Sequence, residues 1–399
     1  MLLDAQARQR FLVSSVFFLL GVQVGVRAVG ISDIYLRLGL DPLELGFIST
    51  VGVSAGILTL AAGGRLVERF GRRAVLTAGL IGTGASYLLN ALVDSYLTLL
   101  LVWVLYGLCC SFIDLGANTV GSDYESASGE SAMTGFHSWF SLGAALGALG
   151  VALVLDAGSS FRPGFAAAGG VLVGLGVVML RAALPDHRLP NPEPDSSGRS
   201  RSVARVPLVL LATAVVFTCF FGDGILETFL STFVRSSTTV LLAGLSITVF
   251  HAGSWVGRVL SARIVRRYGD RRVLVGSGLL AAAAILASIA ARDSWGVTVA
   301  LALVGFAISP IVPLGFSLAG RAAPGQTARA VGFVTAVGYT AFLLSPLAAG
   351  ALADLTSLTW GIGIAAATTA LVALFATRLP RRTRPDPEPR VERQDSVPT

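Results

Sequence analysis

Charged and polar side chains interrupt several long apolar runs of this 399-residue chain. They are Gln23, Arg27, Asp114, Asn118, His137, Asp223, Glu227, His251 and Arg258. A carboxylic acid in a dry cavity holds its proton more tightly than in water, so Asp114 and Asp223 are the best candidates to carry a proton. A nearby arginine such as Arg27 can hold an anionic or hydroxyl-rich solute, or exchange partners with the acid. These residue types therefore indicate proton and solute binding by buried groups.

Each of these side chains also has a purely structural interpretation. Arg27, Asp223 and Glu227 can form a structural charge cluster near one membrane surface. His137, near the start of the fifth run, can serve a proton relay or make a cap or loop contact. His251 can border a cavity or pack between helices. The sequence leaves these alternatives open.

The composition is that of a membrane protein. Apolar residues make up 54% of the chain and charged residues 13%, with a mean hydropathy of +0.75, whereas soluble domains carry about 25% charged residues. All 30 basic residues are arginine and cluster between apolar runs, which favours membrane topology over nucleic-acid binding. The cysteines show no metal-ligand spacing, and no nucleotide-binding loop or nucleophile motif occurs. We therefore expect no enzyme activity, no metal and no cofactor.

Twelve apolar runs approach the length of about 20 residues that a helix needs to cross a bilayer. They are residues 11–32, 43–63, 75–93, 96–118, 133–155, 163–184, 207–233, 240–262, 274–291, 296–319, 329–352 and 357–377. Pro310 and Pro313 interrupt the tenth run. An even number of spans puts both termini on one side, and that side holds 24 arginines against 4 on the other. The positive-inside rule then predicts cytoplasmic termini and a protein of the cell membrane.

Two arginine-rich segments of similar sequence lie about half the chain apart. The first arginine loop is residues 64–73, GRLVERFGRR, and the second arginine loop is residues 262–271, ARIVRRYGDR. Gly269 follows Gly71 by 198 residues, and each loop falls between the second and third apolar runs of its half. The pattern predicts a duplicated six-helix unit. A bare arginine anchor is the alternative, but the fixed glycine and acid spacing favours a hinge. Gly71 and Gly269 would allow a tight turn between helices, and Glu68 would pair with a neighbouring arginine or with a helix N-terminus.

The repeat gives a domain division. We expect an N-terminal six-helix bundle at 1–184 and a C-terminal six-helix bundle at 207–378. The stretch 185–206 is rich in proline, serine and charge, which predicts a flexible cytoplasmic linker. Residues 379–399 have the same character and are expected to be a disordered cytoplasmic tail.

The first arginine loop resembles the signature of the major facilitator superfamily, G-x-L-x-(D/E)-R-x-G-R-R. The matching residues are Gly64, Leu66, Glu68, Arg69, Gly71, Arg72 and Arg73. Arg267, Gly269 and Arg271 of the second loop belong to a degenerate copy, in which Ala262 and Arg266 replace the glycine and the acid. The resemblance implies an all-α fold of twelve transmembrane helices, in which two pseudo-symmetric bundles rock about a midplane cavity. It also implies that the loop acid latches one conformation.

Other stretches are similar to the fucose-permease-like branch and its uncharacterised bacterial relatives. The matching positions are Arg27, Asp114, Asn118, Glu125, His137, Gly257, Arg258, Tyr339 and Pro346. The seventh run departs from that branch, because Thr228 and Phe229 stand where an acid and a tryptophan are typical. The identity of the substrate therefore does not carry over.

These features together predict a monomeric secondary transporter that takes up a small solute with protons. Its partners would be a small-molecule substrate, protons and the lipid bilayer. The fifth run lacks the glycine-proline motif of drug-proton antiporters, which favours uptake. An exporter of lipophilic or anionic compounds is one alternative, and a non-transporting sensor or assembly protein on the same scaffold is another.

Overall fold

The computed structural model describes residues 2–128, 132–182, 203–236, 238–291, 293–324 and 326–380. Within these ranges the chain forms thirteen α-helices, one short 3-10 helix and no strand. The α-helices are α1 (Leu2–Leu38), α2 (Pro42–Phe70), α3 (Arg72–Asn90), α4 (Tyr96–Ser128), α5 (Met133–Asp156), α6 (Phe161–Met179), α7 (Pro207–Arg235), α8 (Val240–Tyr268), α9 (Asp270–Ala290), α10 (Ser294–Ile308), α11 (Ile311–Ala322), α12 (Thr327–Leu355) and α13 (Leu358–Ala376).

Local sequence signals fix several helix ends. Helix α2 begins with a capping box, in which the Asp41 carboxylate accepts from the backbone N–H of Glu44 and the Glu44 carboxylate accepts from that of Asp41. Pro42 takes the first helical position, where its missing N–H costs nothing. Asp293 caps α10 by accepting from the N–H of Gly296 at 2.8 Å. These contacts satisfy backbone donors that the helices themselves leave unpaired.

Proline acts differently in two helices of the second half. Helix α10 ends at Ile308 and α11 begins at Ile311, with Pro310 between them, which confirms the expected interruption at Pro310. Pro313 lies in the first turn of α11 and does not interrupt it. Proline has no N–H to continue the hydrogen-bond ladder, and its ring crowds the preceding turn. Pro346, by contrast, lies inside the unbroken helix α12. The break at Pro310 is therefore decided by its surroundings as well as by the residue type.

Eleven stretches within the described helices are long and apolar enough to cross a membrane. Helices α10 and α11 together form one of them, and α3 is not among them. The all-helical membrane architecture is thus confirmed, whereas the third predicted span, at 75–93, stays a prediction. Helix α3 falls short because it begins with two arginines and contains several small or polar residues, which lower its hydropathy.

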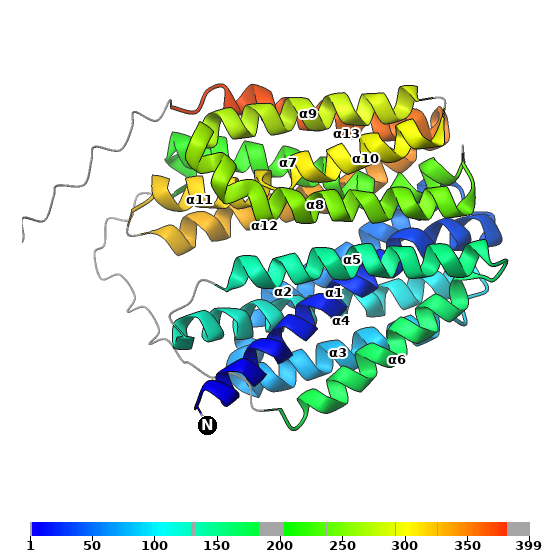
Figure 1. Cartoon of the computed structure of the whole chain (residues 1–399), viewed down its shortest axis with the longest axis horizontal. Helices are drawn as coiled ribbons and strands as arrows, with labels where there is room; N and C mark the ends of the chain where they lie inside the picture. Colours follow the sequence, from blue (N-terminus) through cyan, green and yellow to red (C-terminus); the bar gives the residue numbers. More distant parts are fainter. Residues whose placement is uncertain are drawn as a thin grey trace, which may run out of the picture.

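The helices are arranged in two sets. Helices α1–α6 pack mainly on one another, as do α7–α13, and Figure 1 shows the two sets side by side with α5 facing α8. The sets meet chiefly along α5 with α8 and along α2 with α12. Helices α1 and α7 also touch. This arrangement leaves α1, α2, α4, α5, α7 and α12 around a common space.

The two sets approach each other closely near one end of the molecule. We call the end that carries Gly71 and Gly269 the arginine end, and the end that carries the α1–α2 and α7–α8 turns the opposite end. Near the opposite end, a side chain at Gly46 would collide with the carbonyl oxygen of Pro346. The Thr50 hydroxyl donates to the carbonyl of Leu343 at 3.0 Å in the same seam. The absence of a side chain at Gly46 lets α2 and α12 touch backbone to backbone.

The predicted linker and tail fall largely outside the described residues. Nothing of 183–202 or 381–399 is described, so these predictions stay untested. Residues Val203–Arg205, at the end of the expected linker, form the short 3-10 helix η1. It packs against α7 and α12, directly before α7 begins.

Candidate functional site

A cavity of about 270 Å³ lies between the two helix sets. Six helices contribute to its wall: α1, α2, α4, α5, α7 and α12. Its charged and polar lining residues are Gln23, Arg27, Ser49, Cys110, Ser111, Asp114, Glu227 and Thr228, together with the aromatic side chains of Trp103, Tyr106, Phe140, Tyr339 and Phe342. The wall therefore combines a few charges with a large aromatic surface, as solute-binding sites commonly do.

An ion pair crosses the cavity from one helix set to the other. Arg27 of α1 and Glu227 of α7 lie 2.8 Å apart, nitrogen to oxygen. The Arg27 guanidinium also sits over the rings of Trp103 and Tyr106, at 5.7 Å from each ring centre. Stacking on two rings and pairing with one carboxylate stabilise a charge that would otherwise be costly within the membrane. Two of the three members of the predicted charge cluster thus form a contact between the helix sets.

Gln23 occupies the turn of α1 before Arg27 and is fully buried. The hydroxyl of Tyr87 donates to the side-chain oxygen of Gln23 at 2.7 Å and to its backbone oxygen at 2.6 Å. The amide nitrogen of Gln23 lies 3.6 Å from the sulfur of Cys110, a cavity residue. These bonds fix the side chain of Gln23, so it shapes the wall behind Arg27.

Asp114 lines the cavity without a cation beside it. Its carboxylate accepts a hydrogen bond from the side-chain amide of Asn118, one turn later on α4, at 3.0 Å. The same amide donates to the backbone oxygen of Asp114. Asp114 forms no ion pair with any residue that the structure describes. An uncompensated acid within the membrane is a group that a proton or a cationic solute can neutralise.

A second cluster lies where α5, α7 and α8 meet. Arg258 of α8 donates to the hydroxyl of Ser141 on α5 and sits over the ring of Phe140, 5.8 Å from its centre. Asp223, on α7 one turn before Glu227, has no hydrogen bond or ion pair with any described residue. Arg258 is thus tied to the other helix set rather than to the acid of its own set.

The two predicted histidines lie apart from Asp114. His137 lies one turn inside α5 and packs edge-on against Phe17 of α1, 5.1 Å between ring centres, rather than capping the helix. His251 is buried in α8 and packs against the neighbouring Phe250. Neither histidine contributes to the cavity wall.

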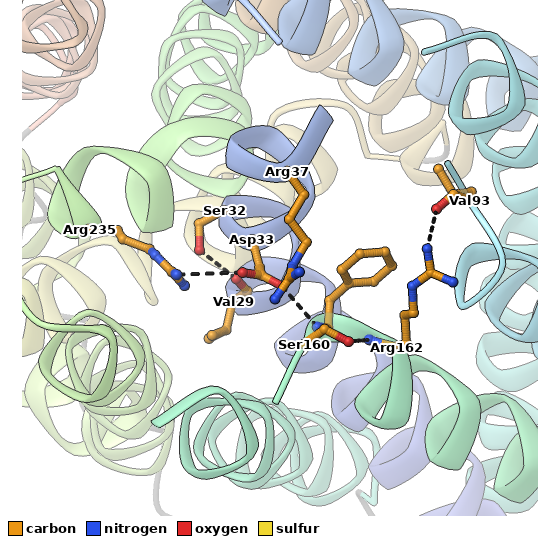
Figure 2. A network of polar contacts seen from close by, with 9 residues as sticks. Val29, Ser32, Asp33, Arg37, Val93, Ser160, Arg162 and Arg235 are labelled. Carbon is orange, nitrogen blue, oxygen red and sulfur yellow. Dashed lines mark hydrogen bonds and ion pairs between the residues drawn. The ribbon is translucent and has the colours of Figure 1, made fainter. Parts of the chain in front are cut away.

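A buried acid at the opposite end was missed by the sequence analysis. Asp33 of α1 accepts from the Nε of Arg37 at 2.7 Å and from the backbone N–H of Phe161, at the start of α6, at 3.0 Å. Arg235 of α7 approaches its other oxygen to 3.5 Å. Figure 2 shows Asp33 between Arg37 and Arg235. The i,i+4 spacing of Asp33 and Arg37 was the signal available in the sequence.

Both arginine loops turn at a glycine with the same backbone conformation. Gly71 has φ 81° and ψ 156°, and Gly269 has φ 79° and ψ 157°, which is a region that only glycine adopts readily. Each glycine ends one helix and starts the next with no intervening residue. The glycines were predicted to make tight turns, and the structure confirms it. Gly64 lies upstream, within α2.

Each loop is also tied to a neighbouring helix by an ion pair. In the first half Arg72 pairs with Asp123 of α4 at 2.8 Å. In the second half Asp270 pairs with Arg321 of α11 at 2.5 Å. The offset of 198 residues relates Arg72 to Asp270 and Asp123 to Arg321, so the two halves hold equivalent pairs with the charges exchanged.

The remaining loop residues differ in their contacts. Arg69 and Arg267 occupy equivalent positions and lie over the neighbouring aromatic rings, of Phe70 and Tyr268, at 5.3 and 5.5 Å. Arg73 donates to the backbone oxygens that follow α6. Glu68 is exposed, and it forms no hydrogen bond or ion pair in the described part of the chain. The sequence-based pairing of Glu68 with an arginine or a helix N-terminus is therefore wrong for this conformation, because its side chain faces outward.

The sequence matches a known protein family over nearly its whole length. The sequence pattern of the Major Facilitator Superfamily matches residues 12–238 and 212–398, which together span nearly the whole chain. The chain belongs to the Major Facilitator Superfamily. An uncharacterised MFS-type transporter of Yersinia pestis is 28% identical over 92% of this chain and 94% of its own. Membrane protein MosC of Rhizobium meliloti is 23% identical over 94% and 90% of the two chains.

Solved structures of this superfamily's fold resemble the chain. A bacterial homologue of the human lysosomal transporter Spinster, in an inward-facing and occupied conformation, aligns with a TM-score of 0.73 and 13% identity. That alignment covers 92% of this chain and 95% of the homologue. A mutant of the nucleoside transporter NupG aligns with a TM-score of 0.73 and 15% identity, covering 94% and 99%. At such identities the likeness shows the fold alone.

Membership in the Major Facilitator Superfamily confirms the predicted family. The chain is a membrane transporter rather than an enzyme. Among the predicted site residues, the structure brings Gln23, Arg27, Asp114 and Glu227 to one cavity, with Asn118 bonded to Asp114. It places Asp223, His137, His251 and Arg258 outside that wall, in the surrounding helix contacts.

Proposed function

We propose that this transporter moves a small solute by alternating access and couples its uptake to proton entry. The observation that carries the proposal is the Arg27–Glu227 ion pair, which joins the two helix sets across a cavity within the membrane. A pair in this position must separate when the two sets part on that side. Charged side chains are costly within a bilayer, so three of them in one cavity favour a transport function over a purely structural one.

The proposed topology has twelve spans, in which α3 is the third and the broken pair α10–α11 is the tenth. It makes residues 1–184 and 207–378 two six-helix bundles joined by a linker at 185–206. Both termini and the arginine end then face the cytoplasm of the cell, since most arginines lie there. The protein would act as a monomer, with its own cavity complete within one chain.

The cavity chemistry suggests how a solute and a proton share the site. Arg27 balances Glu227, whereas Asp114 lacks a cation among the described residues. A proton on Asp114 removes that uncompensated charge from the membrane, which lowers the energy of the loaded cavity. A solute with a polar group that bonds Arg27 or Glu227 weakens their ion pair. Loading the cavity thus loosens the contact that holds the two bundles together.

The second cluster offers a complementary switch. Arg258 reaches Ser141 of the other bundle, and the unpartnered Asp223 lies on α7 of its own bundle. An ionised Asp223 attracts Arg258 away from Ser141, and a protonated Asp223 leaves the inter-bundle bond in place. The protonation of Asp223 would then decide whether α5 stays bonded to α8. His137 and His251 border this region, and a proton-relay role for either requires a rearrangement from the packing seen here.

The test measures proton movement that depends on a solute. Purified protein in liposomes with an internal pH dye would be screened against sugars, carboxylates and lipophilic amines. We expect a solute-dependent pH change that Asp114→Asn and Asp223→Asn each abolish. Asp94→Asn makes the same chemical change at an exposed turn before α4 and should leave the signal intact.

Other outcomes of this experiment select the alternatives. Solute uptake without proton movement would contradict coupling and assign Asp114 and Asp223 to structure. If no solute in the panel is taken up or moves protons, although the melting temperature shows that the protein is folded, a sensor or assembly role on the same scaffold would be favoured.

A second candidate direction is export of a lipophilic or anionic compound. The aromatic surface formed by Trp103, Tyr106, Phe140 and Phe342 favours it, because such rings bind apolar bodies better than hydroxyl-rich ones. Reversing the orientation of the pH gradient in the same liposomes separates the two directions. Uptake predicts solute accumulation on the alkaline side, and proton antiport predicts accumulation on the acidic side.

A further inference from the structure

A groove away from the solute cavity opens on the outer surface of the second helix set. It has a volume of about 320 Å³ and lies between α8, α9 and α10, near the arginine end. Tyr268 and Arg272 line the part nearest the arginine end, which we call its mouth, and Leu280, Phe306 and Pro310 line the part farther from that end, which we call its deep part. From Arg272 to Leu280 along α9 the helix rises about 12 Å, so the groove runs well into the hydrocarbon layer.

The surface around the groove faces lipid. Val259 of α8, Leu279 of α9 and Leu303 of α10 are 49%, 56% and 43% exposed, although all three are large apolar side chains. Side chains of this kind are exposed where a bilayer, rather than water, surrounds the helix. An acyl chain can therefore enter the groove from the membrane without crossing water.

The mouth of the groove is continuous with a larger hollow at the arginine end. This hollow has a volume of about 800 Å³ and shares Tyr268, Arg272 and Gly276 with the groove. Its charged lining consists of Asp270 and three arginines, of which Arg321 pairs with Asp270. Arg271 and Arg272 form no hydrogen bond or ion pair with any residue that the structure describes. The hollow thus holds a positive charge that its own acid does not balance.

We propose that the groove and the hollow together bind one anionic phospholipid of the bilayer. An acyl chain occupies the groove, and the phosphate lies at Arg272 with Arg271 beside it. Arginine matches a phosphate with two parallel donors, and the apolar groove contacts the acyl chain of the same lipid. Charge complementarity at the mouth selects an anionic headgroup over a zwitterionic one. This proposal is independent of the solute and of proton coupling.

The equivalent surface of the first helix set lacks the features that make the site. The offset of 198 residues places Ala74 at the position of Arg272, and Phe112 at the position of Pro310. Arg73, the equivalent of Arg271, already donates to two backbone oxygens. The helix break at Pro310, which α4 does not share, lies at the deep end of the groove. The site is thus specific to the second half of a duplicated fold.

The experiment compares lipid binding to the full chain by native mass spectrometry from detergent. Phosphatidylglycerol and phosphatidylethanolamine with identical acyl chains would be titrated in separate series. We expect phosphatidylglycerol to bind more tightly, and Arg272→Ala to weaken its binding about fivefold, as expected for one arginine near a phosphate. Gly276→Leu fills the junction of groove and hollow and should weaken both lipids. No neighbouring atom opposes a side chain at Gly276, so this variant is expected to fold.

Matched variants provide the controls. Arg263→Ala removes an exposed arginine at the same end of α8 that does not line the groove. Ala78→Leu makes a comparable enlargement at the position equivalent to Gly276 in the first half. Both should leave phosphatidylglycerol binding unchanged. Equal affinity for the two lipids, or unchanged phosphatidylglycerol binding in both Arg272→Ala and Gly276→Leu, would overturn the proposal.

Discussion

The two arginine loops are the same structural device built twice with opposite charges. Both turn at a glycine of positive φ, both stack an arginine on the next aromatic ring, and both tie the start of a helix to a neighbour. In the first half the basic residue Arg72 begins helix α3 and pairs with Asp123. In the second half the acidic residue Asp270 begins helix α9 and pairs with Arg321. Both halves therefore hold an ion pair at this position, with opposite polarity.

The two loops differ at a position whose side chain makes no ion pair with any described residue. Glu68 of the first loop is replaced by Arg266 in the second, and both side chains are exposed. An acid that bonds nothing in this conformation does not stabilise it. A latch role for Glu68 would require a contact that forms only in another conformation of the two bundles. The comparison thus separates residues that hold the loop from a residue that serves a change of state.

The largest expected effect comes from breaking the first pair. Arg72→Asp places a second carboxylate against Asp123, whose side chain is only 7% exposed. Losing one partner of a buried pair costs about 3–5 kcal/mol. The double variant Arg72→Asp with Asp123→Arg copies the polarity of the second half and should recover most of the loss. Thermal unfolding in detergent, followed by tryptophan fluorescence, measures both. Arg69→Asp is the matched exposed control, and a double variant as unstable as the single one would refute the exchangeable polarity.

The next effect concerns the glycine turns. Gly71→Ala and Gly269→Ala each force a side chain into a backbone region that costs about 1–3 kcal/mol. Because their φ and ψ angles agree within two degrees, the two losses in free energy of unfolding should be equal. Gly150→Ala, in a helix with open space around it, is expected to be neutral or stabilising. Clearly unequal losses would show that the two turns are not equivalent in the folded protein.

A smaller effect is expected from Arg321→Ala. The Arg321 side chain is 45% exposed, against 20% for Arg72, so water already screens its pair with Asp270. Asp270 also lines the open hollow, where water can reach it once the arginine is gone. We expect a loss of about 1 kcal/mol, well below that of Arg72→Ala in the same unfolding measurement. Equal losses in free energy of unfolding for Arg321→Ala and Arg72→Ala would show that exposure to water does not weaken the second pair.

The smallest effect on stability is expected from Glu68→Gln. Its side chain has no partner in the described part of the chain, so the unfolding free energy should change by less than about 0.5 kcal/mol. The rate of solute-driven proton movement should nevertheless change, if the acid latches a conformation that this structure does not show. Arg266→Gln, at the equivalent position, should alter neither quantity. A destabilised Glu68→Gln would mean that the acid already bonds in the resting state.

Much of the fold was predictable because its signals are local. Long apolar runs predict helices, and the glycines at 71 and 269 predict turns, since each depends only on a few neighbouring residues. The 198-residue repeat, read with the arginine loops, also predicted the superfamily. Of the charged and polar side chains in the apolar runs, Gln23, Arg27, Asp114 and Glu227 line the cavity, whereas Asp223, His137, His251 and Arg258 do not. Their roles in transport stay predictions. The pairing among them, and the role of Asp33, were not predictable in this way.

The sequence by itself determined that this protein is a helical membrane transporter with a duplicated plan, because hydropathy, charge placement and turn residues act over short stretches. Only the tertiary structure decided that Arg27 pairs with Glu227 rather than Asp223, and that Asp33 joins three helices. These choices depend on how helices from distant parts of the chain pack and rotate against one another. A difference of one helical turn moves a side chain by about 5.4 Å, which is enough to make or lose an ion pair.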